Sequence, residues 1–299
     1  MNWLRRLLPG SATVDVPRVV IARALRGFAD GFVSVFLATY LIALGFSPLQ
    51  VGAIVTGTLL GSAALTLGVG LVAHRRELRV LLLAACGLMA LTGLGFMAVT
   101  AFWALMLVAV VGTLNPSAGD VSVFLPTEQA FLAGHVDDLD RPRLYAVYNL
   151  GAAFAGAFGA LASGLPGYVA KHVDISRIDV FRGSFSIYVA VAVVIFFIYR
   201  GLRTEHSATD VVKVERKPLA ESRRTVIELA ALFCIDAAAG GFVVQSLLVL
   251  WLHLRFGLSV GTTAAVFFGV SLLSAFSQLL AGPLAARIGL VRTMVFTHL

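Results

Sequence analysis

Apolar stretches of transmembrane length alternate with short polar stretches along almost the whole chain. A helix needs about 20 apolar residues to cross a bilayer, so each stretch predicts one transmembrane helix. The predicted spans cover residues 19–44, 49–72, 80–100, 102–126, 144–166, 183–201, 225–254 and 262–285, and a further apolar run begins near Arg292 and reaches Leu299. The pattern predicts an all-α fold, a polytopic helical bundle in a membrane.

Composition supports a membrane protein and argues against a soluble domain. Of the 299 residues, 59% are hydrophobic and only 13% are charged, whereas soluble domains carry about 25% charged residues. Cys86 and Cys234 both fall within predicted spans and are not spaced like a disulfide framework or a metal pair. We therefore expect no metal and no cofactor.

The basic residues predict the orientation in the membrane. If the N-terminus is cytoplasmic, 17 of the 23 Lys and Arg residues lie in cytoplasmic segments, 4 lie outside and 2 lie within the first span. Basic residues concentrate on the cytoplasmic side of membrane proteins, so the formal charge of +7 indicates topology and not a nucleic-acid partner. Arginine greatly outnumbers lysine, and Ala and Gly are abundant, which suggests a GC-rich bacterial gene and therefore an inner (plasma) membrane.

A long polar linker divides the chain into two parts. We expect an N-terminal six-helix block over residues 1–200, a cytoplasmic linker over 201–224 and an incomplete C-terminal block over 225–299. A constant offset of 212 residues relates the two blocks. It pairs Gly45 with Gly257, Ser47 with Ser259, Gly70 with Gly282, Ala73 with Ala285, Arg75 with Arg287 and Leu78 with Leu290. Six matches at one offset predict that the chain arose by duplication.

The loop after the eighth span carries a family resemblance. The stretch GPLAARIG from Gly282 resembles the G-x-L-a-D-R-x-G signature of the major facilitator superfamily, which follows spans two and eight of twelve. The six-span block, the linker and the resumed repeat resemble that family as well. The sequence departs from the signature at its acidic position, which is His74 in the first copy and Ala286 in the second.

The resemblance implies a secondary transporter that works by alternating access and has twelve spans. This sequence holds eight spans and the start of a ninth, so we expect either a fragment of a longer protein, which we favour, or a natural truncation. Gly70, Arg75, Gly282 and Arg287 would belong to cytoplasmic gating loops by the same resemblance, and we expect Glu128 at that interface too. The alternative is that the loop arginines are only topology signals.

The first span carries ionisable residues on one face. Arg23, Arg26, Asp30 and Ser34 fall within about an 80° arc of a helix, and Asp30 lies roughly 16 Å from a span start at Val19. One explanation is a structural Arg26–Asp30 pair, with Arg23 reaching the interface. The other, which we favour for Asp30 and Arg26, is an aqueous path that binds substrate, a proton or both. Gly27 and Gly31, at the edge of the arc, predict a close approach by another helix.

Further polar residues lie at membrane depth in the fourth and seventh spans. Asn115 precedes a proline that should bend the fourth span, and Asp120 is a candidate partner of Arg23. Asp236 is either a counter-charge to the first span's arginines across the pathway or a hydrogen-bonding group within the bundle. Gln245 lies in the same seventh span.

These residues favour a transporter over an enzyme. Only His253 among the histidines lies in a predicted span, and no cluster of nucleophile, base or metal ligands is evident at depth. The expected partners are the lipid bilayer and a small-molecule substrate, with a proton as the candidate coupling ion. The alternative is a degenerate, non-transporting relative.

Overall fold

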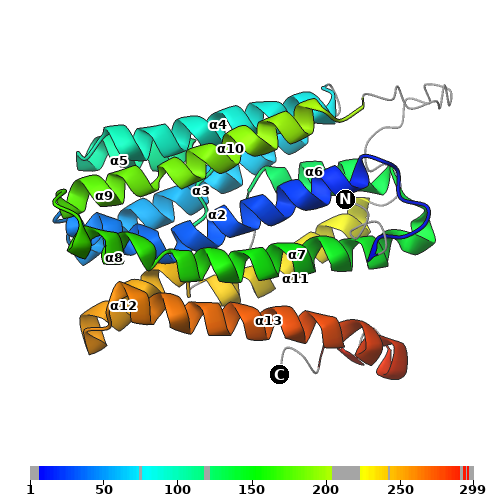
Figure 1. The fold of residues 1–299 in the computed structure, drawn as a ribbon. Helices are drawn as coiled ribbons and strands as arrows, with labels where there is room; N and C mark the ends of the chain where they lie inside the picture. Colours follow the sequence, from blue (N-terminus) through cyan, green and yellow to red (C-terminus); the bar gives the residue numbers. More distant parts are fainter. Residues whose placement is uncertain are drawn as a thin grey trace. The chain divides into compact units, whose positions relative to one another are not determined.

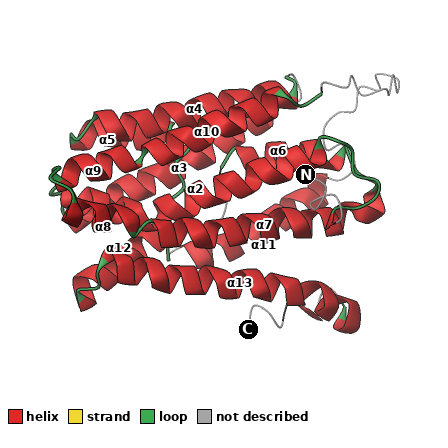
Figure 2. Cartoon of the chain, viewed as in Figure 1, coloured by secondary structure: helices red, strands yellow, loops and turns green. Residues whose placement is uncertain are grey.

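The computed structural model describes residues 7–73, 76–117, 122–203, 223–241, 243–289, 292–293 and 295. Within these ranges the regular elements are helices, and no strand occurs (Figures 1 and 2). The all-α prediction is confirmed. The chain divides into a larger unit, Met1–Leu202 with Gln245–Leu299, and a smaller unit, Arg203–Val244. Each unit is described by itself.

The helices of the larger unit follow the apolar pattern of the sequence. They are α2 (Val16–Ala43), α3 (Pro48–Val72), α4 (Leu78–Ala98), α5 (Phe102–Val111), α6 (Phe124–Ala133), the short 3₁₀ helix η2 (Asp138–Asp140), α7 (Arg141–Ala162), α8 (Leu165–His172), α9 (Arg177–Ser184), α10 (Ser186–Arg200), α12 (Gln245–Phe256) and α13 (Val260–Ile288). The smaller unit contains α11 (Arg223–Gly241).

The predicted repeat is visible in the local geometry of two helix starts. Gly45 and Gly257, which the 212-residue offset pairs, both adopt positive φ, 86° and 65°. Two residues later Ser47 caps α3 by accepting a hydrogen bond from the backbone N–H of Gln50 at 3.4 Å, and Ser259 accepts one from Thr262 at 3.1 Å near the start of α13. Equivalent residues therefore build equivalent helix starts.

Two predicted spans are wrong as continuous helices. The span at 102–126 is broken, because α5 ends at Val111 and a non-helical segment runs through Pro116. Proline lacks a backbone N–H and disfavours helical geometry in the residue before it, so the ladder cannot continue there. The span at 225–254 is two helices, α11 and α12, because Gly240 and Gly241 at the end of α11 lower its helix propensity.

Helix α2 is central to the larger unit and packs against α7, α10 and α12. The predicted close approach is confirmed on its α7 face. A Cβ atom on Gly27 would lie 2.6 Å from the carbonyl oxygen of Ala152, and one on Gly31 would overlap the carbonyl of Gly156. Glycine at these positions lets the two backbones touch.

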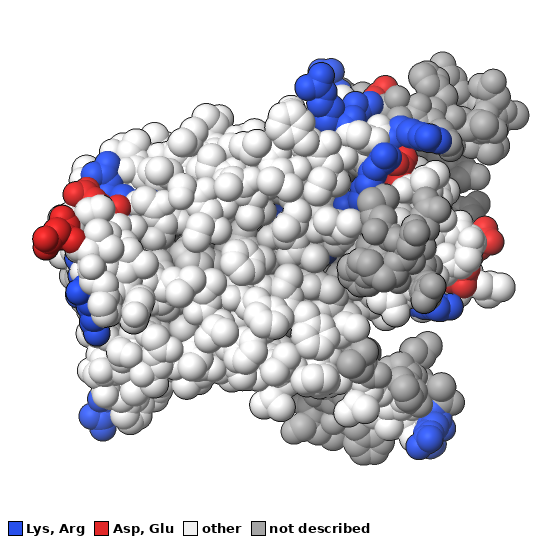
Figure 3. Space-filling model, viewed as in Figure 1, with Lys and Arg blue, Asp and Glu red and all other residues white. Residues whose placement is uncertain are grey.

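The larger unit has two ends that carry its charged groups. At the N-terminal end, Arg18 donates to the carbonyl of Gly201 at 2.8 Å and Arg79 to that of Arg200 at 2.5 Å. At the far end, Arg182 donates to the carbonyl of Met97 at 2.7 Å. The face drawn in Figure 3 shows charged side chains gathered at these ends and an uncharged stretch between them.

Among the described residues, five stretches are long and apolar enough to cross a membrane. They are Pro48–Val72, Leu78–Ala98, Asp138–His172, Arg177–Arg200 and Val260–Ser277. The charged helix α2 is not among the five, although its 28 residues make it about 42 Å long. Three of its charged side chains, those of Arg23, Arg26 and Asp30, are buried among neighbouring helices.

Candidate functional site

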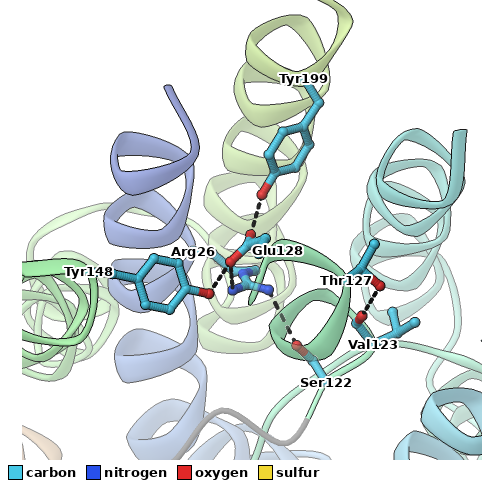
Figure 4. A network of polar contacts seen from close by, with 7 residues as sticks. All are labelled: Arg26, Ser122, Val123, Thr127, Glu128, Tyr148 and Tyr199. Atoms are coloured by element: carbon cyan, nitrogen blue, oxygen red, sulfur yellow. Dashed lines mark hydrogen bonds and ion pairs between the residues drawn. The ribbon is translucent and has the colours of Figure 1, made fainter. Parts of the chain in front are cut away.

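Arg26 is buried in the middle of the larger unit. Its side chain, on α2, is 1% exposed. One guanidinium nitrogen, Nη2, donates to Glu128 Oε2 at 3.0 Å and the other, Nη1, to Ser122 Oγ at 3.3 Å (Figure 4). The guanidinium carbon also lies 4.4 Å from the ring centroid of Phe124. A buried arginine held by a carboxylate, a hydroxyl and an aromatic face is tightly positioned.

Glu128, on α6, is the acceptor at the centre of this arrangement and is 0% exposed. Oε2 accepts hydrogen bonds from Arg26 and from the hydroxyl of Tyr148 on α7, and Oε1 accepts one from the hydroxyl of Tyr199 on α10 (Figure 4). We call Arg26, Ser122, Glu128, Tyr148 and Tyr199 the Glu128 cluster. Because its main members come from α2, α6, α7 and α10, the cluster joins four helices of the first block.

Glu128 was expected in a cytoplasmic interface region, and the structure places it inside the helical bundle on α6, with no exposed surface. A carboxylate can be buried when charged and hydroxyl donors surround it, and three other helices supply those donors here. The sequence indicated none of them, because Arg26, Tyr148 and Tyr199 are 20 to 102 residues away along the chain. Arg26 forms an ion pair with Glu128 at 3.0 Å, which the sequence did not indicate, and the Arg26–Asp30 pair stays a prediction.

The rest of the charged stripe on α2 is also turned into the bundle. Arg23 is 9% exposed and Asp30 is 8% exposed. The guanidinium carbon of Arg23 lies 5.5 Å from the ring centroid of Tyr148, beside the Glu128 cluster. Ser34 is fully buried, and its hydroxyl donates to the carbonyl of Gly31 in its own helix at 3.0 Å. The stripe therefore lies inside the protein. Its use as an aqueous path stays a prediction.

A second polar contact joins the first block to the start of α12. The hydroxyl of Ser246 donates to the carbonyl of Ser34 at 2.6 Å and lies 3.0 Å from the carbonyl of Pro116, which also accepts from the backbone N–H of Ser246 at 3.2 Å. The break of the fourth span frees this carbonyl. Asn115 beside it is buried and accepts from Ser117, from the backbone N–H at 3.2 Å and from the hydroxyl at 3.0 Å.

Ser34 and Ser246 are separated by 212 residues, the offset of the repeat. A residue that contacts its own equivalent in a two-fold arrangement lies at the symmetry axis. Two residues that the predicted repeat makes equivalent, one on α2 and one on α12, therefore contact each other. Gln245, which precedes Ser246 at the first position of α12, is buried as well.

The remaining predicted residues do not join these contacts. Asp236 belongs to α11 in the smaller unit, and its side chain, like all of Asp120 and Arg75, lies outside the described residues. Gly70 and Arg287 were expected in loops but lie in the last turns of α3 and α13. Helix α3 ends at Val72, as the apolar pattern predicted, whereas α13 continues to Ile288, beyond the predicted end at residue 285. Gly282 also lies within α13.

Ser122, Tyr148, Tyr199 and Ser246 were not predicted from the sequence. Both tyrosines lie in predicted spans, where a hydroxyl needs a partner. The need of two buried hydroxyls for hydrogen-bond acceptors could have predicted a polar cluster. It could not have identified Glu128 as the acceptor. Ser246 follows from the 212-residue offset, which pairs it with Ser34.

Apolar helices and buried polar groups are typical of an integral membrane protein. The internal repeat is typical of transporters that are built from two related halves. Residues 19–299 match the Major Facilitator Superfamily. The chain belongs to this family, which is a family of membrane transporters and not of enzymes. It is also 22% identical, over 96% of its length and 71% of the other protein, to the uncharacterized membrane protein YJR124C of Saccharomyces cerevisiae.

Proposed function

We propose that this protein is a secondary active transporter that moves a small solute across the membrane by alternating access. The contact of Ser246 with Ser34 and Pro116 is the observation that carries the proposal. Alternating access needs two repeats that close on each other at one side of a central site and separate there in another state. A short hydrogen-bonded contact at the symmetry axis is a contact that such a motion can make and break.

The described contacts between α2 and α12 lie in the second half of α2, toward the far end of the larger unit. We infer that this conformation is closed at the far end. With the N-terminus in the cytoplasm, as the basic residues predict, the closed side is the outside. An inner (plasma) membrane of a bacterium remains the composition-based expectation for the location.

The two charged groups at the centre have different proposed roles. Arg26 already has a buried carboxylate partner within its own block, so we assign it to positioning and to modulating the charge of the site. Asp30, one turn further along α2 and 8% exposed, is the candidate for the coupling proton. An intramembrane carboxylate that gains and loses a proton can bias a two-state equilibrium if the two states hold the proton differently.

The experiment is a flux assay on purified protein in liposomes that contain a pH-sensitive dye. Small solutes are applied by chemical class, as monocarboxylates, sugars, amino acids and organic cations, and both radiolabelled uptake and internal pH are followed. We expect one class to enter with a matching pH change. Asp30→Asn should remove the pH change, whereas Asp179→Asn, an exposed carboxylate at the far end paired with Arg182 at 3.6 Å, should leave it intact.

The outcomes separate the parts of the proposal. Uptake whose pH dependence is the same in wild type and Asp30→Asn refutes Asp30 as the coupling acid and leaves the transporter in place. Absence of uptake for all classes, from folded and monodisperse protein, refutes transport by this chain and favours the non-transporting relative.

A further inference from the structure

A cavity of about 220 Å³ lies at the far end of the larger unit, away from the Glu128 cluster. Four helices form it, α2 and α9 of the first block and α12 and α13 of the second. Its walls are mainly apolar, with Ile42 from α2 and Val249 and Leu250 from α12 among them. The cavity therefore bridges the two repeats next to their contact at Ser246.

Two basic side chains and a hydroxyl interrupt the apolar wall, namely Arg177, His253 and Thr39. The described residues that line the cavity include no carboxylate. Arg177 stacks on the ring of Phe181, with 5.1 Å between the guanidinium carbon and the ring centroid. The neighbouring Asp179 is engaged elsewhere, since it bonds to Ser176 at 2.8 Å and pairs with Arg182. The guanidinium therefore has no neutralising acid in the wall of the cavity.

The hydrogen bond of His253 fixes which of its nitrogens carries a proton. Nδ1 lies 3.0 Å from the carbonyl oxygen of Leu258. Because a carbonyl oxygen only accepts, Nδ1 is the donor, and Nε2 is left for another partner. An imidazole held in this way adds a polar group to the cavity without cancelling the positive charge of Arg177.

We propose that this cavity binds a small amphipathic anion, with an apolar body against α2 and α12 and one carboxylate or phosphate on Arg177. Guanidinium groups bind planar and tetrahedral anions through paired hydrogen bonds. Apolar walls with a few placed polar groups are typical of small-molecule sites. A cavity of about 220 Å³ has room for a short-chain carboxylate. Free carboxylates and the headgroup of an anionic lipid share this chemistry.

A ligand in this cavity would depend on the conformation of the protein. It would contact both repeats, and separation of the repeats at the far end would pull its two walls apart. A ligand that binds one state better shifts the equilibrium toward that state. The site would therefore hold the protein closed at the far end and act as an inhibitory site distinct from the central stripe on α2.

The test measures binding and not transport, so its result is independent of the proposed function. Radiolabelled hexanoate is equilibrated with the purified full chain in nanodiscs of neutral phosphatidylcholine. Hexanol and hexylamine serve as neutral and cationic analogues of similar size. We expect saturable hexanoate binding that excess unlabelled hexylamine does not displace. A second set of nanodiscs contains anionic phosphatidylglycerol in place of part of the neutral lipid.

Three variants decide where the probe binds. Arg177→Gln should weaken hexanoate binding at least about tenfold, as loss of a hydrogen-bonded charge does. Ala43→Leu should also weaken it by filling the cavity without changing charge. Arg255→Gln is the matched control, because Arg255 is an exposed cation on α12 that does not line the cavity.

Each outcome supports or overturns the proposal. Binding that depends on Arg177 and Ala43 but not on Arg255 supports it, and competition by phosphatidylglycerol identifies a lipid headgroup as the source of the anion. Equal affinity in wild type and Arg177→Gln, or displacement by hexanol as effective as that by hexanoate, overturns it. If folded protein shows no saturable hexanoate binding in neutral nanodiscs or in those with phosphatidylglycerol, the proposal is overturned as well.

Discussion

Replacing Glu128 by Gln tests whether the Glu128 cluster holds the first block together. Glutamine has nearly the same shape but places an N–H₂ group where one carboxylate oxygen stood. If the amide nitrogen faces Arg26 and Tyr148, it meets two donors; if it faces Tyr199, the guanidinium still loses its counter-charge. Either orientation removes the carboxylate charge of the Arg26–Glu128 ion pair.

The expected loss of stability is large. Removing one partner of a buried ion pair costs about 3–5 kcal/mol. A change of 1 kcal/mol shifts the melting temperature by about 2–4 °C in a domain of about 150–250 residues, so we expect a decrease of about 10 °C. Tyr199→Phe removes one hydrogen bond to a charged acceptor and should cost about 1.5–3 kcal/mol, which is a smaller decrease.

The assay is thermal unfolding of purified protein in neutral detergent, followed by loss of the monodisperse peak after heating. The double variant Arg26→Met with Glu128→Met serves as the matched control, because apolar residues of similar size often replace a buried pair at little cost. It should be more stable than Glu128→Gln alone. The reasoning is refuted if Glu128→Gln melts within about 1 °C of wild type, or if the double variant has a lower melting temperature than Glu128→Gln.

Three further results are expected. Gly31→Val should abolish folded protein or lower its melting temperature sharply, since a Cβ atom there overlaps the carbonyl of Gly156, whereas Gly52→Val, with open space around its Cα, should be tolerated. Ser246→Ala should lower the melting temperature by about 3–10 °C, corresponding to about 1–3 kcal/mol for hydrogen bonds lost at a buried site. A cysteine at Lys171 should react with a membrane-impermeant maleimide added outside intact cells, because the predicted topology places residue 171 outside.

Each of these predictions has a control variant or an outcome that would contradict it. Ser34→Ala is the control for Ser246→Ala, because the Ser34 hydroxyl bonds within its own helix while the Ser34 carbonyl, which accepts from Ser246, is retained. Equal melting temperatures for the two variants would argue against a stabilising contact between the repeats. Folded, monodisperse Gly31→Val protein of wild-type stability would mean that α2 and α7 are further apart than described. Labelling at residue 171 only after permeabilisation would invert the topology.

The sequence was sufficient for the class of the fold and for the family. Apolar stretches of the length of a bilayer can only be helices when backbone groups must be satisfied within the segment, so composition and period predicted the all-α bundle. The 212-residue offset predicted the repeat, and the paired geometry of Gly45 and Gly257 follows it. Gly27 and Gly31 predicted a close helix contact because the absence of a side chain is itself the signal.

Local sequence was less informative about where helices stop. The span at 102–126 contains enough apolar residues to cross the membrane, yet Pro116 interrupts it and leaves a carbonyl for Ser246. The length of an apolar stretch shows only that the stretch can lie in lipid, and not that it forms one continuous helix. Whether a chain bends inside that length depends on which neighbour accepts or donates the hydrogen bonds that the bend releases.

The sequence by itself therefore determined a helical membrane protein, its duplication and the presence of costly charges on the first long helix. It did not determine which groups neutralise those charges. Asp30, four residues from Arg26, was the nearest choice along the chain, but Glu128 on α6, with Tyr148 and Tyr199, forms the buried cluster. Only the tertiary structure decides this, because the free energy of a buried charge depends on the donors and acceptors that distant helices bring within about 3 Å.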